Sequence, residues 1–218
     1  GLGDVYKRQI MVFASILGVA LAVGLFFFLP SFLFDLTANV VPVFQGNGES
    51  AVFWKSVFEG VLKIALFLGY IVLCSQMTEM KRVFMYHGAE HKTIFCYENE
   101  EELTVENVRK QIRFHPRCGT SFMVLMLIVG IVIGLFIPVA PFGIGFLRPV
   151  FKILLLPVSC GIGYELIKIC GKHDNAFTRV IAAPGLWAQR ITTKEPDDKM
   201  IEVAIELSLI HISEPTRH

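Results

Sequence analysis

The sequence lacks an excess of charge of either sign. Its 218 residues include 20 Lys and Arg against 19 Asp and Glu, and charged residues make up only 18% of the chain. The net charge therefore points to no class of partner. The basic segments also lack the interleaved aromatic side chains that stack on single-stranded nucleic acid, and no nucleotide-binding glycine loop or internal repeat is evident. We expect no nucleic-acid partner.

The sequence has only five cysteines, an odd number, which argues against a disulfide framework. Two of the five cysteines, Cys96 and Cys118, lie in a polar segment, and Cys74, Cys160 and Cys170 lie in or near apolar runs. This distribution agrees with a reducing compartment for the polar segment. We expect no structural disulfide.

Long apolar runs, by contrast, are abundant. Hydrophobic residues make up 54% of the chain, the mean hydropathy is +0.59 and 19 residues are Phe. This composition is typical of an integral membrane protein. A helix needs about 20 apolar residues to span the hydrocarbon core of a bilayer. Four segments meet or approach that length: residues 10–34, 57–77, 122–140 and 150–169.

The two ends of the chain differ in character from the rest. The stretches DVYKRQ (4–9) and LSLIHISEPTR (207–217) resemble translated sequencing-adapter ends, which carry no information on the fold. We therefore expect residues 1–9 and 207–218 to be non-native. The membrane domain is then expected to occupy residues 10–206, truncated at both ends.

Basic residues gather in two of the segments that border the apolar runs. Lys and Arg are concentrated in the loop 81–121 and in the tail 171–206, whereas residues 35–56 and 141–149 hold one each. Under the positive-inside rule, the loop and the tail face the cytoplasm. The sequence thus predicts an all-α, multi-pass protein of the cytoplasmic (inner) membrane, with about four transmembrane helices and a small cytoplasmic helical region.

The loop 81–121 concentrates the residues that can ligate a metal. His87, Glu90 and His91 form an H-x-x-E-H pattern, and positions i, i+3 and i+4 share one face of a helix. His115 and Cys118 form an H-x-x-C pair in a turn. Imidazole and thiolate suit zinc, so His87, His91, His115 and Cys118 predict a divalent-metal site, with zinc as the expected ion. The alternative is an ordinary polar surface helix and turn, since inverted-zincin proteases carry H-x-x-E-H in a fold without membrane segments.

A carboxylate also lies within the fourth apolar run. An intramembrane acid is a functional candidate by default, so we expect Glu165 to point into the helix bundle as a catalytic group, further ligand or proton carrier. The alternative is an ion pair with Lys168, three residues further on. In the second run, Glu59 and Lys63 have the spacing to neutralise each other at the membrane interface.

Local signals predict helices within the loop 81–121. The helix of the second run is expected to continue past Met77 into the H-x-x-E-H segment, and Thr104 has the chemistry of an N-cap for a short helix over 105–113. Val105, Val108 and Ile112 would form its apolar stripe. Gly88 either weakens the longer helix or lets another backbone come close.

Three segments together resemble a known family. MYHGAEHKTIFCYE, LTVENVRKQIRFHPRCGTSF and PGLWAQRITTKEPDDKMIEVAI are similar, in this order, to segments of the YqhQ-like family of bacterial membrane proteins. The function of that family is unknown, and its members are commonly labelled predicted metal-dependent enzymes. The resemblance implies a multi-span bacterial membrane protein. It marks these positions: His87, Glu90, His91, His115, Arg117 and Cys118.

The predicted function is that of a metal-dependent membrane enzyme, with a hydrolase as the reaction class. In this hypothesis His87, His91 and Cys118 are ligands, His115 is a fourth ligand or a support, and Glu90 is the general base that deprotonates water at the metal. The bilayer is the surrounding partner, and the substrate is lipid-linked or a membrane protein. Two non-enzymatic alternatives stay open: a membrane assembly or quality-control factor, and a small transporter that uses Glu165 as the carrier, which would need a homo-oligomer.

Overall fold

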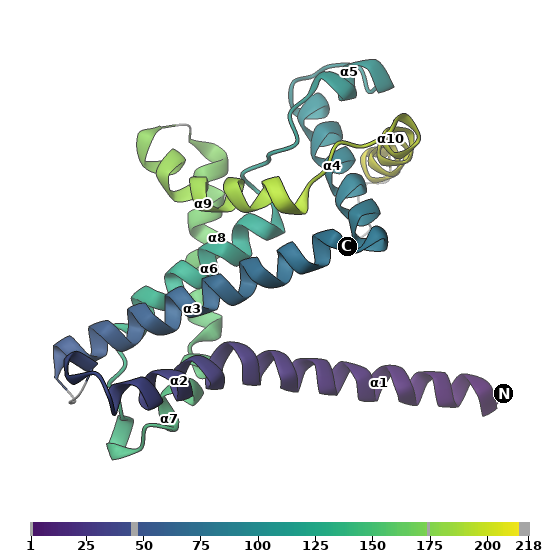
Figure 1. Cartoon of the computed structure of the whole chain (residues 1–218). Coiled ribbons are helices and arrows are strands. Elements are labelled where there is room, and N and C mark those ends of the chain that lie inside the picture. The colour runs from purple at the N-terminus through teal and green to yellow at the C-terminus, as the bar shows by residue number, and fades with distance from the viewer. Residues whose placement is uncertain (1, 45–47, 174, 214–218) are drawn as a thin grey trace. The chain divides into compact units, whose positions relative to one another are not determined.

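The structure is a computed structural model that describes residues 2–44, 48–173 and 175–213. Every regular element in these residues is a helix (Figure 1), which confirms the all-α prediction. The α-helices are α1 (Leu2–Val23), α2 (Leu29–Ala38), α3 (Glu49–Gln76), α4 (Thr78–Glu98), α5 (Val105–Lys110), α6 (Gly119–Gly134), α7 (Leu147–Leu154), α8 (Leu156–Lys172), α9 (Ala176–Thr192) and α10 (Asp198–Ser213). The shorter elements are a π-helical turn, η1 (Gly24–Phe28), and two 3-10 helices, η2 (Pro42–Phe44) and η3 (Pro141–Gly143).

Two helical segments are long and apolar enough to cross a membrane. They are Val5–Ala38, which runs through α1, η1 and α2, and α3. The pair α7 and α8 passes the same test together but is bent by 48°. α6 has 16 residues, which is about 24 Å at 1.5 Å per residue and less than a hydrocarbon core of about 30 Å. The described helices therefore supply two candidate spans, or three if the bent pair is one span.

Prolines explain why the last two apolar runs form shorter helices than their lengths suggest. α6 ends at Gly134, and Pro138 lies in the loop that follows. Proline disfavours helical backbone in the residue before it and has no N–H to donate. In the fourth run the break falls at Leu155, because the ring of Pro157 crowds the carbonyl of Ile153 and cannot donate to it.

The chain divides into two compact units. The first unit comprises residues 1–66 and 127–160, and the second comprises residues 67–126 and 161–218. α3, α6 and α8 each begin in one unit and end in the other. The two units bury different kinds of polar group.

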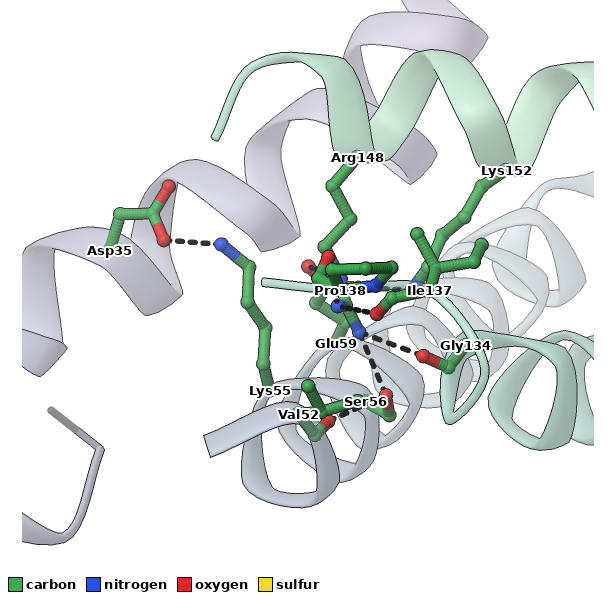
Figure 2. Close-up of polar contacts among 10 residues, drawn as sticks. All are labelled: Asp35, Val52, Lys55, Ser56, Glu59, Gly134, Ile137, Pro138, Arg148 and Lys152. Atoms are coloured by element: carbon green, nitrogen blue, oxygen red, sulfur yellow. Dashed lines mark hydrogen bonds and ion pairs between the residues drawn. The ribbon is translucent and has the colours of Figure 1, made fainter. Parts of the chain in front are cut away.

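The first unit is built around buried ions. Glu59 on α3 is 2% exposed, and Arg148 and Lys152 on α7 are 0% and 8% exposed. One Glu59 oxygen pairs with the Lys152 ammonium, and the other lies 3.6 Å from Arg148 Nε (Figure 2). The expected Glu59–Lys63 pair is replaced, because α7 presents two buried cations directly to this carboxylate. The Lys63 ammonium instead lies 4.9 Å from the ring centroid of Phe27.

Arg148 also closes the carboxyl-terminal end of α6. Its guanidinium donates to the carbonyls of Gly134, Ile137 and Pro138, and to Ser56 Oγ at 2.8 Å (Figure 2). The last carbonyls of a helix have no intrahelical donor, so the arginine satisfies that of Gly134, whereas the carbonyls of Ile137 and Pro138 lie in the loop after α6. A Cβ at Gly134 would lie only 3.2 Å from Ser56 Oγ, which shows why a residue without a side chain fits this point of the network.

In the second unit, α4, α5 and α10 pack together (Figure 1). The buried residues of their core are Ala89, Cys96, Val108, Met200, Ile201, Ala204 and Ile205. The predicted cap of α5 is confirmed, because Thr104 Oγ1 accepts from the backbone N–H of Asn107 at 3.3 Å. The helix ends at Lys110, earlier than predicted. Ile112 therefore falls outside its apolar stripe and is 61% exposed.

α4 does not continue α3 as the sequence had suggested. Met77, between them, is extended, with φ −75° and ψ 133°. Along α4, Gly88 admits a second backbone segment: the N–H of Lys194 donates to the carbonyl of Phe84 at 2.8 Å, and a Cβ at Gly88 would overlap the Lys194 carbonyl oxygen. The close backbone approach predicted as one reading of Gly88 is confirmed. It fixes the chain that follows α9 against α4.

Candidate metal centre

Two turns of α4 and the start of α6 bring three candidate ligands together. His87 and His91 lie four residues apart on α4, so their rings share one face, with centroids 4.4 Å apart. Cys118 immediately precedes α6. One ligand atom from each residue, two imidazole nitrogens and the Cys118 sulfur, all lie within 4.8 Å of one another. The structure thus brings together the two sequence patterns that were predicted to converge.

Backbone carbonyls fix the orientation of both imidazoles. His87 Nδ1 lies 2.9 Å from the carbonyl oxygen of Thr192, and His91 Nδ1 lies 2.6 Å from that of Arg113. A carbonyl only accepts, so each Nδ1 must carry the proton and donate it. In a neutral ring this leaves a lone pair on Nε2. Both histidines are therefore in the tautomer in which Nε2 can ligate, and a hydrogen bond from the other ring nitrogen is the usual support of a metal-bound histidine.

The surroundings of Cys118 favour the thiolate form of its side chain. Burial by itself raises its pKa, but the hydrogen bonds with His87, with His91 and with the backbone N–H of Thr120 outweigh burial and lower the pKa to about 5. His87 Nε2 lies 3.2 Å from the sulfur, and the Thr120 nitrogen lies 3.4 Å from it. The hydrogen bond to Cys118 in turn raises the pKa of His87, against the effect of burial. A thiolate is the form of cysteine that binds metals.

The geometry and the donor types fit zinc. With Zn–N near 2.0–2.1 Å and Zn–S near 2.3 Å, tetrahedral ligand atoms lie roughly 3.3–3.6 Å apart. The separation of His87 Nε2 and Cys118 Sγ, 3.2 Å, lies close to that range, and no two of the three ligand atoms are more than 4.8 Å apart. Two nitrogens and one sulfur leave a fourth position, as in zinc sites that bind water or substrate. The residues present therefore suit a divalent ion of this class.

The structure places His115 beside the cluster rather than in it. Its ring centroid lies 5.9 Å from that of His91. The backbone N–H of Arg117 donates to His115 Nδ1 at 3.2 Å, so Nε2 carries the proton and donates to Glu98 at 3.3 Å. Burial lowers the pKa of His115, although Glu98 opposes this effect. With both nitrogens engaged, His115 supports the turn, which was the second of its two predicted roles.

One buried residue that the sequence did not single out holds this turn in place. Gln189 of α9 is fully buried, and its side chain accepts from the N–H of His115 at 2.8 Å and donates to its carbonyl at 2.6 Å. It also donates to Ser121 Oγ at 2.7 Å. These hydrogen bonds hold in place the segment that carries Cys118. A lone glutamine in an amphipathic stretch gives no sequence signal for such a role.

Glu90 and His87 open onto a cavity of about 450 Å³ in the second unit. Glu90 is exposed, and its charge contributes to raising the pKa of His87. Thr120 and Thr192 also line the cavity, whereas most of the remaining lining residues are apolar or aromatic, including Phe67, Tyr70, Ile71 and Met123. The cavity is thus mainly apolar, and Glu90 and the candidate ligand His87 are among its few polar lining residues.

The other predicted catalytic carboxylate points elsewhere. Glu165 on α8 has a side chain that is 61% exposed, and it lies 3.6 Å from the Lys168 ammonium. The expectation that it points into a bundle is wrong, and the i, i+3 pair is what the structure shows. The reason is local: Gly163, two residues earlier, carries the close contact with Met126, so this face of α8 packs while the face that bears Glu165 turns outward.

All five cysteines are free thiols in the structure.

Comparisons with known proteins give a family but no activity. The family described as "Protein of unknown function (DUF1385)" matches residues 4–212. A curated protein, the "Uncharacterized protein YqhQ" of Bacillus subtilis (strain 168), is 42% identical over 182 residues, which cover 81% of this chain and 56% of that protein. The chain therefore spans little more than half the length of this relative. No solved structure matches. The chain therefore belongs to the DUF1385 family of proteins of unknown function.

Proposed function

We propose that this protein is a metal-dependent membrane enzyme, a hydrolase whose zinc ion is held by His87, His91 and Cys118. One observation carries the proposal: two imidazole nitrogens and a sulfur converge within 4.8 Å, and both imidazoles are fixed through Nδ1 by backbone carbonyls. Buried polar groups normally find partners of opposite character. Three electron-pair donors that face one another suit a shared cation.

The roles of the side chains follow from their positions. A zinc ion held by His87, His91 and Cys118 would supply Lewis acidity, which can bring the pKa of water toward ~7. Glu90, exposed at the cavity beside His87, takes the proton from the attacking water and returns it to the leaving group. His115 and Gln189 keep the Cys118 turn in place. Glu90 is thus the general base of the proposed reaction.

The substrate class follows from the cavity. Glu90 and His87 line it, and most of its other lining residues are apolar. Such a cavity suits a molecule with an apolar body and one cleavable polar group. A lipid-linked compound or an apolar segment of a membrane protein meets that description.

The location rests on the charge pattern. Candidate spans and the basic loop and tail support a multi-pass protein of the cytoplasmic membrane, with about four crossings if α6 and the bent pair each count as one. The positive-inside rule then puts the loop 81–121, and the metal site with it, on the cytoplasmic face. Glu165 pairs with Lys168, so the carboxylate on which a transporter would depend is already engaged.

Metal analysis of the detergent-purified full chain tests the proposal. We expect about one zinc ion per chain in the unaltered protein and only trace zinc after His87→Ala with His91→Ala. His173→Ala is the matched control, because His173 is an exposed histidine outside the cluster, and it should leave the zinc content unchanged. Equal, trace metal in the unaltered protein and the double variant would refute the proposal.

A further inference from the structure

One face of α9 is packed against the segment that carries the candidate metal centre. Gln189 on this face is fully buried and binds the backbone N–H and carbonyl of His115. The carbonyl of Thr192, at the end of the helix, accepts from His87 Nδ1 at 2.9 Å. The inner face of α9 is therefore polar where it is buried, and it fixes both the turn before α6 and one candidate ligand.

The opposite face of α9 is exposed and apolar. Phe177 is 67% exposed, Val180 73% and Trp187 59%. At 3.6 residues per turn, these three positions lie within about 80° of one another around the helix. Ala183 and Pro184 are also exposed. Because monomeric soluble proteins rarely expose contiguous apolar patches of this kind, the outer face of α9 requires an apolar neighbour.

α5, in the same unit, has the pattern of a helix that faces water. Its exposed residues are Glu106, Arg109 and Lys110, all of them charged, and its buried residue is Val108. A helix at the boundary between a protein and water is apolar inside and charged outside. α9 shows the reverse arrangement, with buried polar side chains and exposed large apolar ones. Such a reversal is expected where the medium outside the helix is less polar than water.

The start of α9 is tied to the end of α8. α8 ends at Lys172 and belongs to the bent helix pair that is apolar enough to span a membrane. Four residue steps separate Lys172 from Ala176, the first residue of α9, and they reach at most about 14 Å. The Thr178 hydroxyl also donates to the carbonyl of His173 at 2.7 Å. A span that ends at Lys172 therefore delivers the first turn of α9 to the membrane surface.

α9 has the dimensions of a helix that lies along a membrane and does not cross it. Its 17 residues extend about 26 Å, which is less than a hydrocarbon core of about 30 Å. A crossing would also place Arg179 and Arg190 in or near that core. Trp187 lies on the exposed face, and tryptophan is enriched at the boundary between membrane and water.

We propose that α9 lies in the surface of the lipid bilayer, with Phe177, Val180 and Trp187 inserted at the boundary between headgroups and acyl chains. Such an apolar face is buried about 5–10 Å into this boundary. The inner face, with Gln189 and Thr192, then lies about 10 Å further out, one helix diameter away. Contact with lipid thus sets the height of the candidate metal centre above the membrane. The inference depends neither on a bound metal nor on enzymatic activity.

Fluorescence quenching of the full chain in vesicles tests the inference. The chain contains two tryptophans, so Trp54→Phe leaves Trp187 as the single emitter. This variant is reconstituted into phosphatidylcholine vesicles whose lipids carry bromine either near the headgroup or near the end of the acyl chain. We expect bromine near the headgroup to quench Trp187 about twofold more strongly than bromine near the chain end, and aqueous iodide to quench it weakly. Strong quenching by iodide without quenching by bromine would overturn the proposal.

A relocated tryptophan distinguishes a helix that lies flat from one that enters the bilayer. Val180→Trp, combined with Trp54→Phe and Trp187→Phe, places the emitter on the same face seven residues earlier. A flat helix holds positions 180 and 187 at the same depth, whereas a helix that enters the bilayer separates their depths by up to about 10 Å. We therefore expect the same ratio of quenching by the two brominated lipids. Clearly different ratios would overturn the proposed orientation.

Ile112→Trp in the same background is the matched control. Ile112 is 61% exposed and follows α5, the helix with the charged outer face. Its tryptophan should be quenched by iodide and not by bromine. Quenching by bromine as strong as that of Trp187 would show that the signal does not report α9, and it would overturn the assignment. Helical content of each variant checks that it is folded.

A second copy of the chain is the alternative neighbour of this face. It would protect Trp187 from bromine and from iodide alike, and this outcome would overturn the assignment to lipid. With lipid as the neighbour, quenching by bromine should stay unchanged when the protein is diluted in the vesicles. Quenching by bromine that appears only on dilution would assign the face to contact between copies and would also overturn the proposal.

Discussion

The two units bury polar groups in opposite ways. In the first unit, the buried Glu59 carboxylate faces the buried cations Lys152 and Arg148, so charges of opposite sign satisfy one another (Figure 2). In the second unit, two imidazole nitrogens and a sulfur face one another, and all three are electron-pair donors. In the first arrangement the carboxylate already has counter-ions within the chain. The second becomes complete only with a proton or a cation, which is why we place function in the second unit and structural support in the first.

The two units also use backbone carbonyls in different ways. Arg148 donates to the last carbonyl of α6 and to two carbonyls of the loop after it, and thereby ties this loop to the ionic network of the first unit. His87 and His91 donate to carbonyls through Nδ1 and thereby leave Nε2 without a proton. The same kind of acceptor stabilises a structure in one unit and prepares a ligand in the other.

The largest expected effect comes from breaking the ionic network. Glu59→Gln removes the carboxylate that pairs with Lys152 and Arg148 and leaves these two buried cations without that partner. Losing one partner of a buried ion pair costs about 3–5 kcal/mol, so thermal unfolding in detergent should shift markedly downward. Glu90→Gln, which alters an exposed carboxylate, serves as the control. If both variants unfold at the temperature of the unaltered protein, the network is not a structural centre.

Zinc should stabilise the second unit by a smaller amount. At a free zinc concentration one hundred times the dissociation constant, binding to the folded state adds about 2.7 kcal/mol. Thermal unfolding of chelator-treated protein should therefore rise on addition of zinc, and Cys118→Ser should abolish most of the rise. Magnesium, which prefers oxygen ligands, should have no effect. A rise of equal size in the Cys118→Ser variant would contradict the ligand set.

The ionisation of Cys118 should be visible in its reactivity. Because its pKa is lowered to about 5, the thiolate predominates at every pH above that value. In chelator-treated protein, the rate of alkylation at Cys118 should stay nearly constant from pH 8 to pH 6 and fall about tenfold per unit below pH 5. Burial raises the pKa of Cys96, so its alkylation should decline across the whole range. Peptide mass spectrometry separates the two sites, and parallel profiles would contradict the assignment.

The smallest effect should come from an ion pair at the surface. Arg109 of α5 and Asp198 of α10 pair in the second unit with side chains 56% and 58% exposed. Exposed pairs contribute about 0–1 kcal/mol, because water screens them. Asp198→Asn should therefore shift thermal unfolding only slightly, far less than Glu59→Gln. A comparable loss in the two variants would remove the distinction between the buried ions of the first unit and the exposed ions of the second.

The sequence by itself determined the local features. The apolar runs, the helical class and the Thr104 cap follow from residue types at short range. The spacing of His87 and His91 suffices to place both rings on one face of α4, because an α-helix repeats every 3.6 residues. Where proline interrupted an apolar run, the count of apolar residues overestimated the helix.

Only the tertiary structure decided which side chains meet. Cys118 lies 31 residues from His87, and the carbonyl of Thr192 that fixes His87 lies 105 residues away. Glu59 pairs with Lys152, 93 residues away, instead of with Lys63, which the sequence spacing had favoured. Contacts at such separations depend on how helices pack, and packing depends on burial and shape summed over many residues rather than on any short pattern. For this reason the sequence could name candidate ligands, whereas only the folded chain could separate the three that converge from His115, which supports them.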